Sequence, residues 1–117
     1  MKLQILTFLK DSFEEDYVLI CEIIRTFMLD QDRILKEIEN ARRREDSKSI
    51  YEGIHALKSA VAVFGDTEAY EALARTESFF MNAKMVDGNK ELIMMYQSLS
   101  LLSASLQEIR KQLESPQ

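Results

Sequence analysis

The sequence has few of the residues that interrupt regular structure. Its 117 residues include three glycines and one proline, and that proline, Pro116, stands next to the end. Since glycine and proline mark most turns, their scarcity leaves long uninterrupted segments and favours helices over a β fold with many turns. No apolar run reaches the roughly 18 residues of a membrane span, and the opening MKLQILTFLK lacks the long apolar core and cleavage site of a signal peptide.

Cysteine and histidine each occur once, as Cys21 and His55. A single cysteine excludes an intramolecular disulfide, and the apolar neighbours of Cys21 predict a buried, inert thiol. This thiol usage fits a reducing compartment, so we expect a cytoplasmic protein. One histidine and one cysteine also offer too few ligands for a typical zinc site, and we expect no bound metal.

The acidic balance of the chain disfavours nucleic acid as the main partner. The formal net charge is −5, whereas binding to phosphates requires a basic surface. Basic residues cluster at Arg42-Arg43-Arg44, where Glu39, Glu45 and Asp46 flank them. This cluster is interpreted as a solvated helix end, where the helix dipole favours cations.

Apolar residues recur at steps of three and four through most of the chain, which is the spacing of amphipathic helices. They predict a short helix over residues 2–10, a long one that continues to about residue 43, a third over 50–64, a fourth from about residue 67, and a last one over 92–113. The stripe of the long helix weakens at 29–32, so a kink or break there is an open alternative.

Capping residues mark the ends of these helices. Ser12 with Glu15 predicts a capping box at the start of the long helix. Asp46 or Ser47 is the expected N-cap of the third helix, and Gly65 is its expected C-cap in the left-handed conformation.

Short connections between the helices predict the topology. Residues 66–68 restart a helix directly after Gly65, and the turn signal Asp87-Gly88-Asn89 precedes the last helix. Helices joined by a few residues run antiparallel to their neighbours. We therefore predict an all-α fold in a single domain over residues 1–117: an antiparallel up-down four-helix bundle with a short extra helix at the N-terminus.

His55 is expected to point away from the core. On a helical wheel it lies about 140° from the centre of the apolar stripe of its helix. Geometry alone leaves an incidental surface histidine as open as a functional one. Lys58 lies on the same outward face, together with four residues that form a candidate partner-binding face, namely Lys48, Tyr51, Ser59 and Ala62.

The outward histidine suits covalent chemistry better than hydrolysis. No acidic residue stands four positions before or after His55 to orient the ring, although another helix could supply one. A neutral imidazole is a competent nucleophile at neutral pH. A phosphoryl group accepted there would carry close to two negative charges, and Lys58, one turn along the same face, could offset part of that charge.

The segment from His55 to Gly65, HALKSAVAVFG, resembles the signature of histidine-containing phosphotransfer (HPt) domains. In that family an aliphatic residue, a lysine and a later glycine follow the phosphoacceptor histidine, as Leu57, Lys58 and Gly65 do here. Ala60 and Ala62 keep the family's small residues. Further along, Glu77 falls where the family often has a Leu-Glu pair, with Thr76 in place of the leucine.

The resemblance implies a carrier rather than an enzyme. His55 would accept a phosphoryl group from a histidine kinase, which could belong to the same parent chain, or from the aspartate of a receiver domain, and would pass it to a receiver domain. Lys58 would stabilise the phosphoryl group. The implied partners are receiver domains and kinases, without a cofactor, nucleotide, nucleic acid or membrane insertion, and the expected state is a monomer.

Ser59 departs from the family pattern, which has glycine at this position. Its hydroxymethyl group could slow transfer, could donate a hydrogen bond to the phosphoryl group, or could mark a degenerate copy. The alternative function is therefore a bundle that binds proteins without being phosphorylated. A phosphoacceptor domain of a chemotaxis-type kinase and a dimerisation bundle are further alternatives.

Overall fold

The computed structural model describes residues 3–82 and 88–114, and all regular structure in them is helical. This confirms the all-α prediction. The helices are α1 (Leu3–Ser12), α2 (Tyr17–Arg43), α3 (Ser47–Val61), α4 (Thr67–Asn82) and α5 (Asn89–Glu114), and the short 3-10 helix η1 (Ala62–Phe64) continues α3. Of the predicted turn before the last helix, Asp87 lies outside the described residues, while Gly88 directly precedes α5. None of the helices in the described ranges combines the length and apolar character that crossing a membrane requires.

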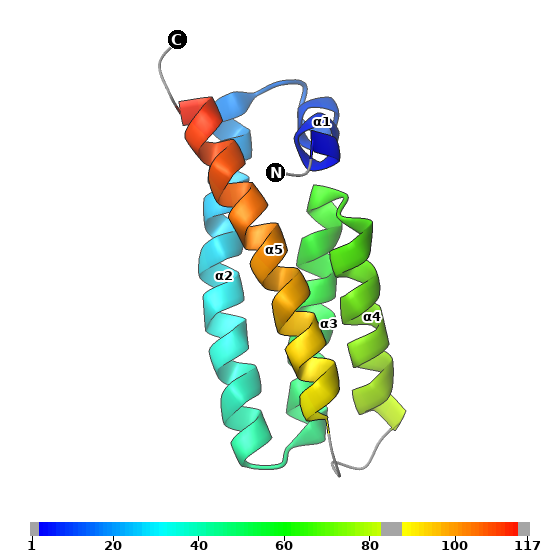
Figure 1. Cartoon of the computed structure of the whole chain (residues 1–117). Coiled ribbons are helices and arrows are strands. Elements are labelled where there is room, and N and C mark those ends of the chain that lie inside the picture. Colours follow the sequence, from blue (N-terminus) through cyan, green and yellow to red (C-terminus); the bar gives the residue numbers. More distant parts are fainter. Residues whose placement is uncertain (1–2, 83–87, 115–117) are drawn as a thin grey trace.

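The four longer helices lie side by side, and each packs mainly on two others. Helix α2 packs on α3 and α5, and α4 packs on the same two helices. Consecutive long helices run in opposite directions, and α1 lies across one end of the assembly, close to η1 (Figure 1). The apolar stripes face inward and form one core, whose largest fully buried side chains include Ile20, Ile24, Ile38, Ile54, Leu57, Phe64, Leu73 and Met95.

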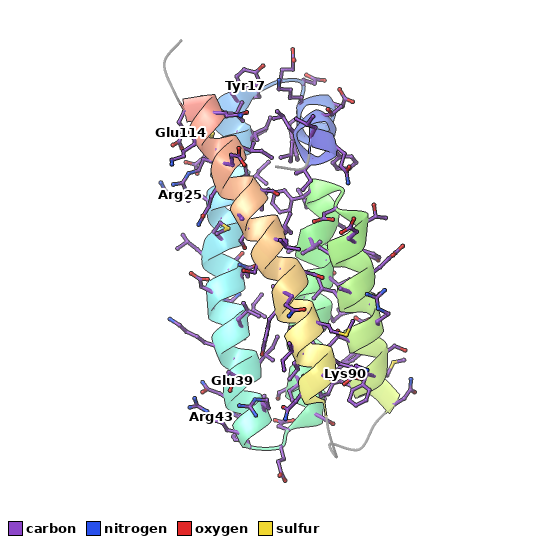
Figure 2. All side chains as sticks on the ribbon, in the orientation of Figure 1. Tyr17, Arg25, Glu39, Arg43, Lys90 and Glu114 are labelled. Atoms are coloured by element: carbon purple, nitrogen blue, oxygen red, sulfur yellow. The ribbon has the colours of Figure 1, made fainter. Side chains whose placement is uncertain are left out.

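Charged side chains occupy the outer surface, as Figure 2 shows for Arg25 and Arg43 on α2. The basic run at the end of α2 is solvated, as its interpretation as a helix end requires. Arg42 donates hydrogen bonds to Glu39, and a guanidinium nitrogen of Arg44 lies 3.7 Å from the carboxylate of Asp46. Helix α2 ends at Arg43, close to the predicted boundary.

Two of the predicted caps are confirmed. Asp46 caps α3 by accepting hydrogen bonds from the backbone N–H of Ser49 at 3.1 Å and from its hydroxyl at 2.7 Å. These bonds hold the pKa of the Asp46 carboxyl below its usual value. Gly65 ends the helical segment with φ +66°, in the left-handed region that glycine adopts without steric cost.

The predicted capping box at Ser12 and Glu15 is wrong. Ser12 is the last residue of α1, and the chain reverses through Glu14 and Glu15, which have φ values of 52° and 58°. Asp16 is the N-cap instead, and its carboxylate accepts a hydrogen bond from the backbone N–H of Leu19 at 3.1 Å. The reversal between α1 and α2 places non-helical residues where the first turn after the box would lie.

Helix α2 passes through residues 29–32 as one continuous helix. The stripe weakens there because Gln31, a polar residue, occupies an inward position and is 5 % exposed. Its side-chain amide donates a hydrogen bond of 2.9 Å to the hydroxyl of Ser103 on α5. The bond satisfies the amide nitrogen of this buried group, while Oε1 of Gln31 has no hydrogen-bond partner among the described residues.

Cys21 is half-buried rather than buried. Desolvation raises the pKa of its thiol, which keeps it in the protonated, less nucleophilic form. Partial burial is therefore enough to make the Cys21 thiol less nucleophilic, as expected of an unreactive thiol.

Replacing Gly65 by alanine is expected to destabilise the protein by about 1–2 kcal/mol, the usual cost of a left-handed non-glycine residue. The new Cβ would also lie 2.6 Å from the ring of Phe8, so α1 must shift. Thermal unfolding measures the loss. In a Phe8→Ala background only the backbone cost should remain, and an unchanged melting temperature in both backgrounds would contradict the prediction.

Candidate functional site

The packing of α3 determines where His55 points. Ile50, Ile54, Leu57 and Val61 are fully buried against the other helices, so the opposite face of α3 is directed outward. The His55 side chain on that face is 57 % exposed. The predicted orientation of the histidine away from the core is therefore confirmed.

A carboxylate from the neighbouring helix contacts the histidine ring. Glu77 of α4 places its Oε2 atom 2.6 Å from Nδ1 of His55 and its Oε1 atom 2.7 Å from Nζ of Lys58. Thr76 and Phe80 of α4 are buried in the core, which leaves Glu77 at the boundary facing α3. The Glu77 side chain is only 14 % exposed, so the three side chains form a partly buried network, the His55–Glu77–Lys58 network.

The network keeps Glu77 ionised. Burial by itself would raise the pKa of Glu77, but the hydrogen bonds and charges of Lys58 and His55 outweigh this effect and hold that pKa below its usual value. The hydrogen bond to Glu77 in turn raises the pKa of Lys58. Glu77 is therefore a carboxylate at neutral pH, next to the ammonium of Lys58 and the ring of His55.

An ionised Glu77 fixes the tautomer of His55. A carboxylate only accepts hydrogen bonds, so the ring nitrogen 2.6 Å from it, Nδ1, must carry the proton. In a neutral ring the lone pair then lies on Nε2, the nitrogen that points away from Glu77. The site thus presents an oriented, solvent-accessible nitrogen nucleophile.

Two tyrosines border the network. The ring of Tyr51 lies 6.1 Å from the His55 ring at an interplanar angle of 19°, and Nζ of Lys58 lies 5.8 Å from the centre of the Tyr70 ring. Sequence reasoning did not place Tyr70 at the site, nor did it assign Glu77 a contact with the histidine. The sequence did carry one indication of their shared position. Tyr70 and Glu77 are seven residues apart, a spacing that puts both on one face of α4.

The predicted members of the partner-binding face lie on the outward side of α3 and on the start of η1. Lys48, Ser59 and Ala62 are exposed, as expected. Tyr51 is half-buried and packs partly on the core, so its ring contributes one edge rather than a fully open surface. Among the described residues there is no group of three or more side chains arranged to hold a metal ion.

The site combines an exposed histidine, a carboxylate that contacts one nitrogen of its ring, and a lysine bound to the same carboxylate. A family model, the Hpt domain, matches residues 22–114. The chain belongs to the Hpt domain family, whose members have a phosphotransfer role in two-component phosphorelays. No curated protein and no solved structure matches the chain.

Proposed function

We propose that this chain is a phosphocarrier in a multistep phosphorelay, with His55 as the phosphoacceptor. The observation that carries the proposal is the contact of 2.6 Å between Nδ1 of His55 and Glu77, which leaves Nε2 as an exposed nucleophile. We infer further that α2–α5 form an up-down four-helix bundle that serves as a rigid mount, that the protein acts as a monomer in the cytoplasm, and that it is a carrier rather than an enzyme.

The transfer step follows from this geometry. The lone pair of Nε2 attacks the phosphorus of an aspartyl phosphate on a receiver domain, the N–P bond forms, and the P–O bond to the receiver carboxylate breaks. The receiver carboxylate leaves with the electron pair, and the proton on Nδ1 stays in place. The ring gains a positive charge, which Glu77 stabilises through its hydrogen bond. Phosphoryl transfer depends mainly on such positioning and charge compensation, and the receiver supplies its acidic pocket and Mg²⁺.

The proposed partner-binding face consists of Lys48, Tyr51, Ser59 and Ala62. Beyond Ser59 it continues into a groove of about 380 Å³ between α2 and the end of α3. Apolar side chains line this groove, among them Ile23, Phe27, Ala60 and Val63. We assign it to the receiver domain, because a receiver whose aspartate reaches Nε2 must rest on the surface next to His55. A histidine kinase, on a separate or the same parent chain, is the alternative donor.

Ser59 keeps a second candidate function open, that of a bundle that binds proteins and is never phosphorylated. The intact His55–Glu77–Lys58 network favours the carrier, because an oriented ring nitrogen matters for phosphoryl transfer and not for protein binding alone.

Incubation with several phosphorylated receiver domains tests the proposal. Intact mass should show the gain of one phosphoryl group, and its bond should be labile in acid and stable in base. Several receivers are needed because a single one can be a non-partner. No transfer from any of them would favour the interaction module.

Lys58→Ala is expected to slow phosphoryl acceptance by roughly threefold, the effect of an exposed charge interaction. Lys58 is partly exposed and bound to Glu77, so its charge acts on the phosphoryl group through water and alongside the carboxylate. Single-turnover transfer kinetics give the measurement. Lys36→Ala, an exposed lysine of α2 outside the proposed partner-binding face, is the matched control, and equal rates for both variants would remove Lys58 from the mechanism.

A further inference from the structure

The orientation of the His55 ring defines the side on which a phosphoryl group must lie. Nδ1 points to Glu77 on α4, and Nε2 is on the opposite side of the five-membered ring. A phosphoryl group on Nε2 therefore extends away from α4, over the part of α3 that borders α2. Which residues of α3 lie on that side decides what the phosphoryl oxygens can contact.

Lys58 and Ser59 lie on opposite sides of His55. Viewed along α3, Lys58 is turned about 60° from His55 and Ser59 about 40° in the other direction. Lys58 reaches Glu77 of α4, so its direction is toward α4. Ser59 must then lie on the side to which Nε2 points.

The local geometry brings the Ser59 hydroxyl toward the ring. Side chains on a helix tilt toward its N-terminus, so Ser59, one turn after His55, leans back over the histidine. The Tyr51 ring, one turn before, lies nearly parallel to the imidazole at 6.1 Å, on the N-terminal side of the ring. Ser59 thus borders the ring face that Tyr51 leaves open.

The Ser59 hydroxyl is available as a donor. The residue is exposed, and within residues 3–82 and 88–114 no protein group accepts a hydrogen bond from it. Thr76 shows the contrasting case, since its hydroxyl is bound to the carbonyl of Ala72 at 2.8 Å. On the same side of α3, Glu52 presents an exposed carboxylate that would repel a phosphoryl dianion. A hydrogen bond from Ser59 would offset part of this repulsion.

We propose that the Ser59 hydroxyl donates a hydrogen bond to a phosphoryl oxygen on Nε2 of His55, and that it lengthens the lifetime of the phosphohistidine relative to a glycine at this position. The inference rests on the proposed function and assigns Ser59 a positioning role within it. In a loose transition state the dianionic group approaches singly charged metaphosphate. The hydrogen bond is then stronger in the phosphohistidine than in the transition state of its hydrolysis, which slows the loss of phosphate.

Phosphoramidate allows the test without any partner protein. Nε2 attacks its phosphorus, the N–P bond of the reagent breaks, ammonia leaves, and a new N–P bond forms on His55 while Nδ1 keeps its proton. The half-life of the phosphohistidine and its ³¹P resonance are then followed for the wild-type chain and for Ser59→Ala, Ser59→Gly and Ser59→Thr. Ser100→Ala, an exposed serine of α5, is the matched control.

The alanine and glycine variants should lose phosphate about threefold faster than the wild type and share a shifted ³¹P resonance, as expected for one modest hydrogen bond. The threonine variant should restore both values, and Ser100→Ala should change neither. Wild-type lifetimes in the alanine and glycine variants would overturn the role of Ser59 and leave the carrier function standing. Failure of receiver domains to charge a chain that phosphoramidate does charge would instead contradict the carrier function alone, and a wild-type chain that neither donor charges overturns both.

Discussion

The His55→Gln variant is expected to take up no phosphoryl group from any donor that charges the wild-type chain. Glutamine keeps a polar side chain of similar length but has no nucleophilic ring nitrogen. Because His55 is 57 % exposed, the fold should persist, with a stability change within about 0.5 kcal/mol. Intact mass after incubation with charged receiver domains measures uptake, and circular dichroism with thermal unfolding confirms the folded state.

Phosphate measured on the folded His55→Gln protein tests the assignment of His55 directly. A folded His55→Gln protein that retains phosphate would place the acceptor elsewhere and remove His55 from the mechanism. Since His55 is the single histidine of the chain, any remaining acid-labile, base-stable phosphate would require another nitrogen nucleophile, such as a lysine.

Glu77→Gln is expected to lower the rate of phosphoryl acceptance by roughly a hundredfold, because the wrong tautomer disables an otherwise intact histidine. The amide oxygen of glutamine would turn to Lys58, and its NH₂ group would then face Nδ1. A donor at that position favours the proton on Nε2, the atom that must attack. The loss of the negative charge also removes the stabilisation of the positive ring that forms on transfer.

Nitrogen NMR of the His55 ring separates this effect from a general loss of structure. The wild-type spectrum should show the proton on Nδ1, and the Glu77→Gln spectrum should show it on Nε2. Glu71→Gln, an exposed glutamate on the same helix with the same change of net charge, is the matched control. A Glu77→Gln rate within twofold of the wild type would exclude Glu77 as the residue that orients the ring.

The helices were predictable because local patterns determine them. The three- and four-residue spacing of apolar residues in α3 and α5 reports directly on burial, and Asp46 and Gly65 are caps whose chemistry acts within one turn. The error at Ser12 and Glu15 has a different origin. The path of the chain between α1 and α2 depends on how α1 packs against η1 and α2, and a capping motif does not contain this information.

The histidine was predictable, whereas the environment that orients it was not. His55, Lys58 and Ser59 lie within one turn of a single helix, so a helical wheel places them together. The contact between His55 and Glu77 joins residues separated by 22 positions, and it depends on the rotation of α4 against α3. Within α4, packing places Ala69 and Thr76 inward. Their neighbours Tyr70 and Glu77 therefore lie at the edge of α4 that faces the site.

Sliding α2 along α5 by one helical turn would separate Gln31 from Ser103 and leave the amide nitrogen of Gln31 unpaired in the interior, at a cost of about 1–3 kcal/mol. The same helix α2 carries Ile23 and Phe27, which form one wall of the groove beside α3. The α2–α5 bond thus helps to hold this wall of the groove in place. Under the proposed function, a receiver that docks there loses little free energy to ordering of the carrier, which suits complexes that form and dissociate with every phosphoryl group passed on.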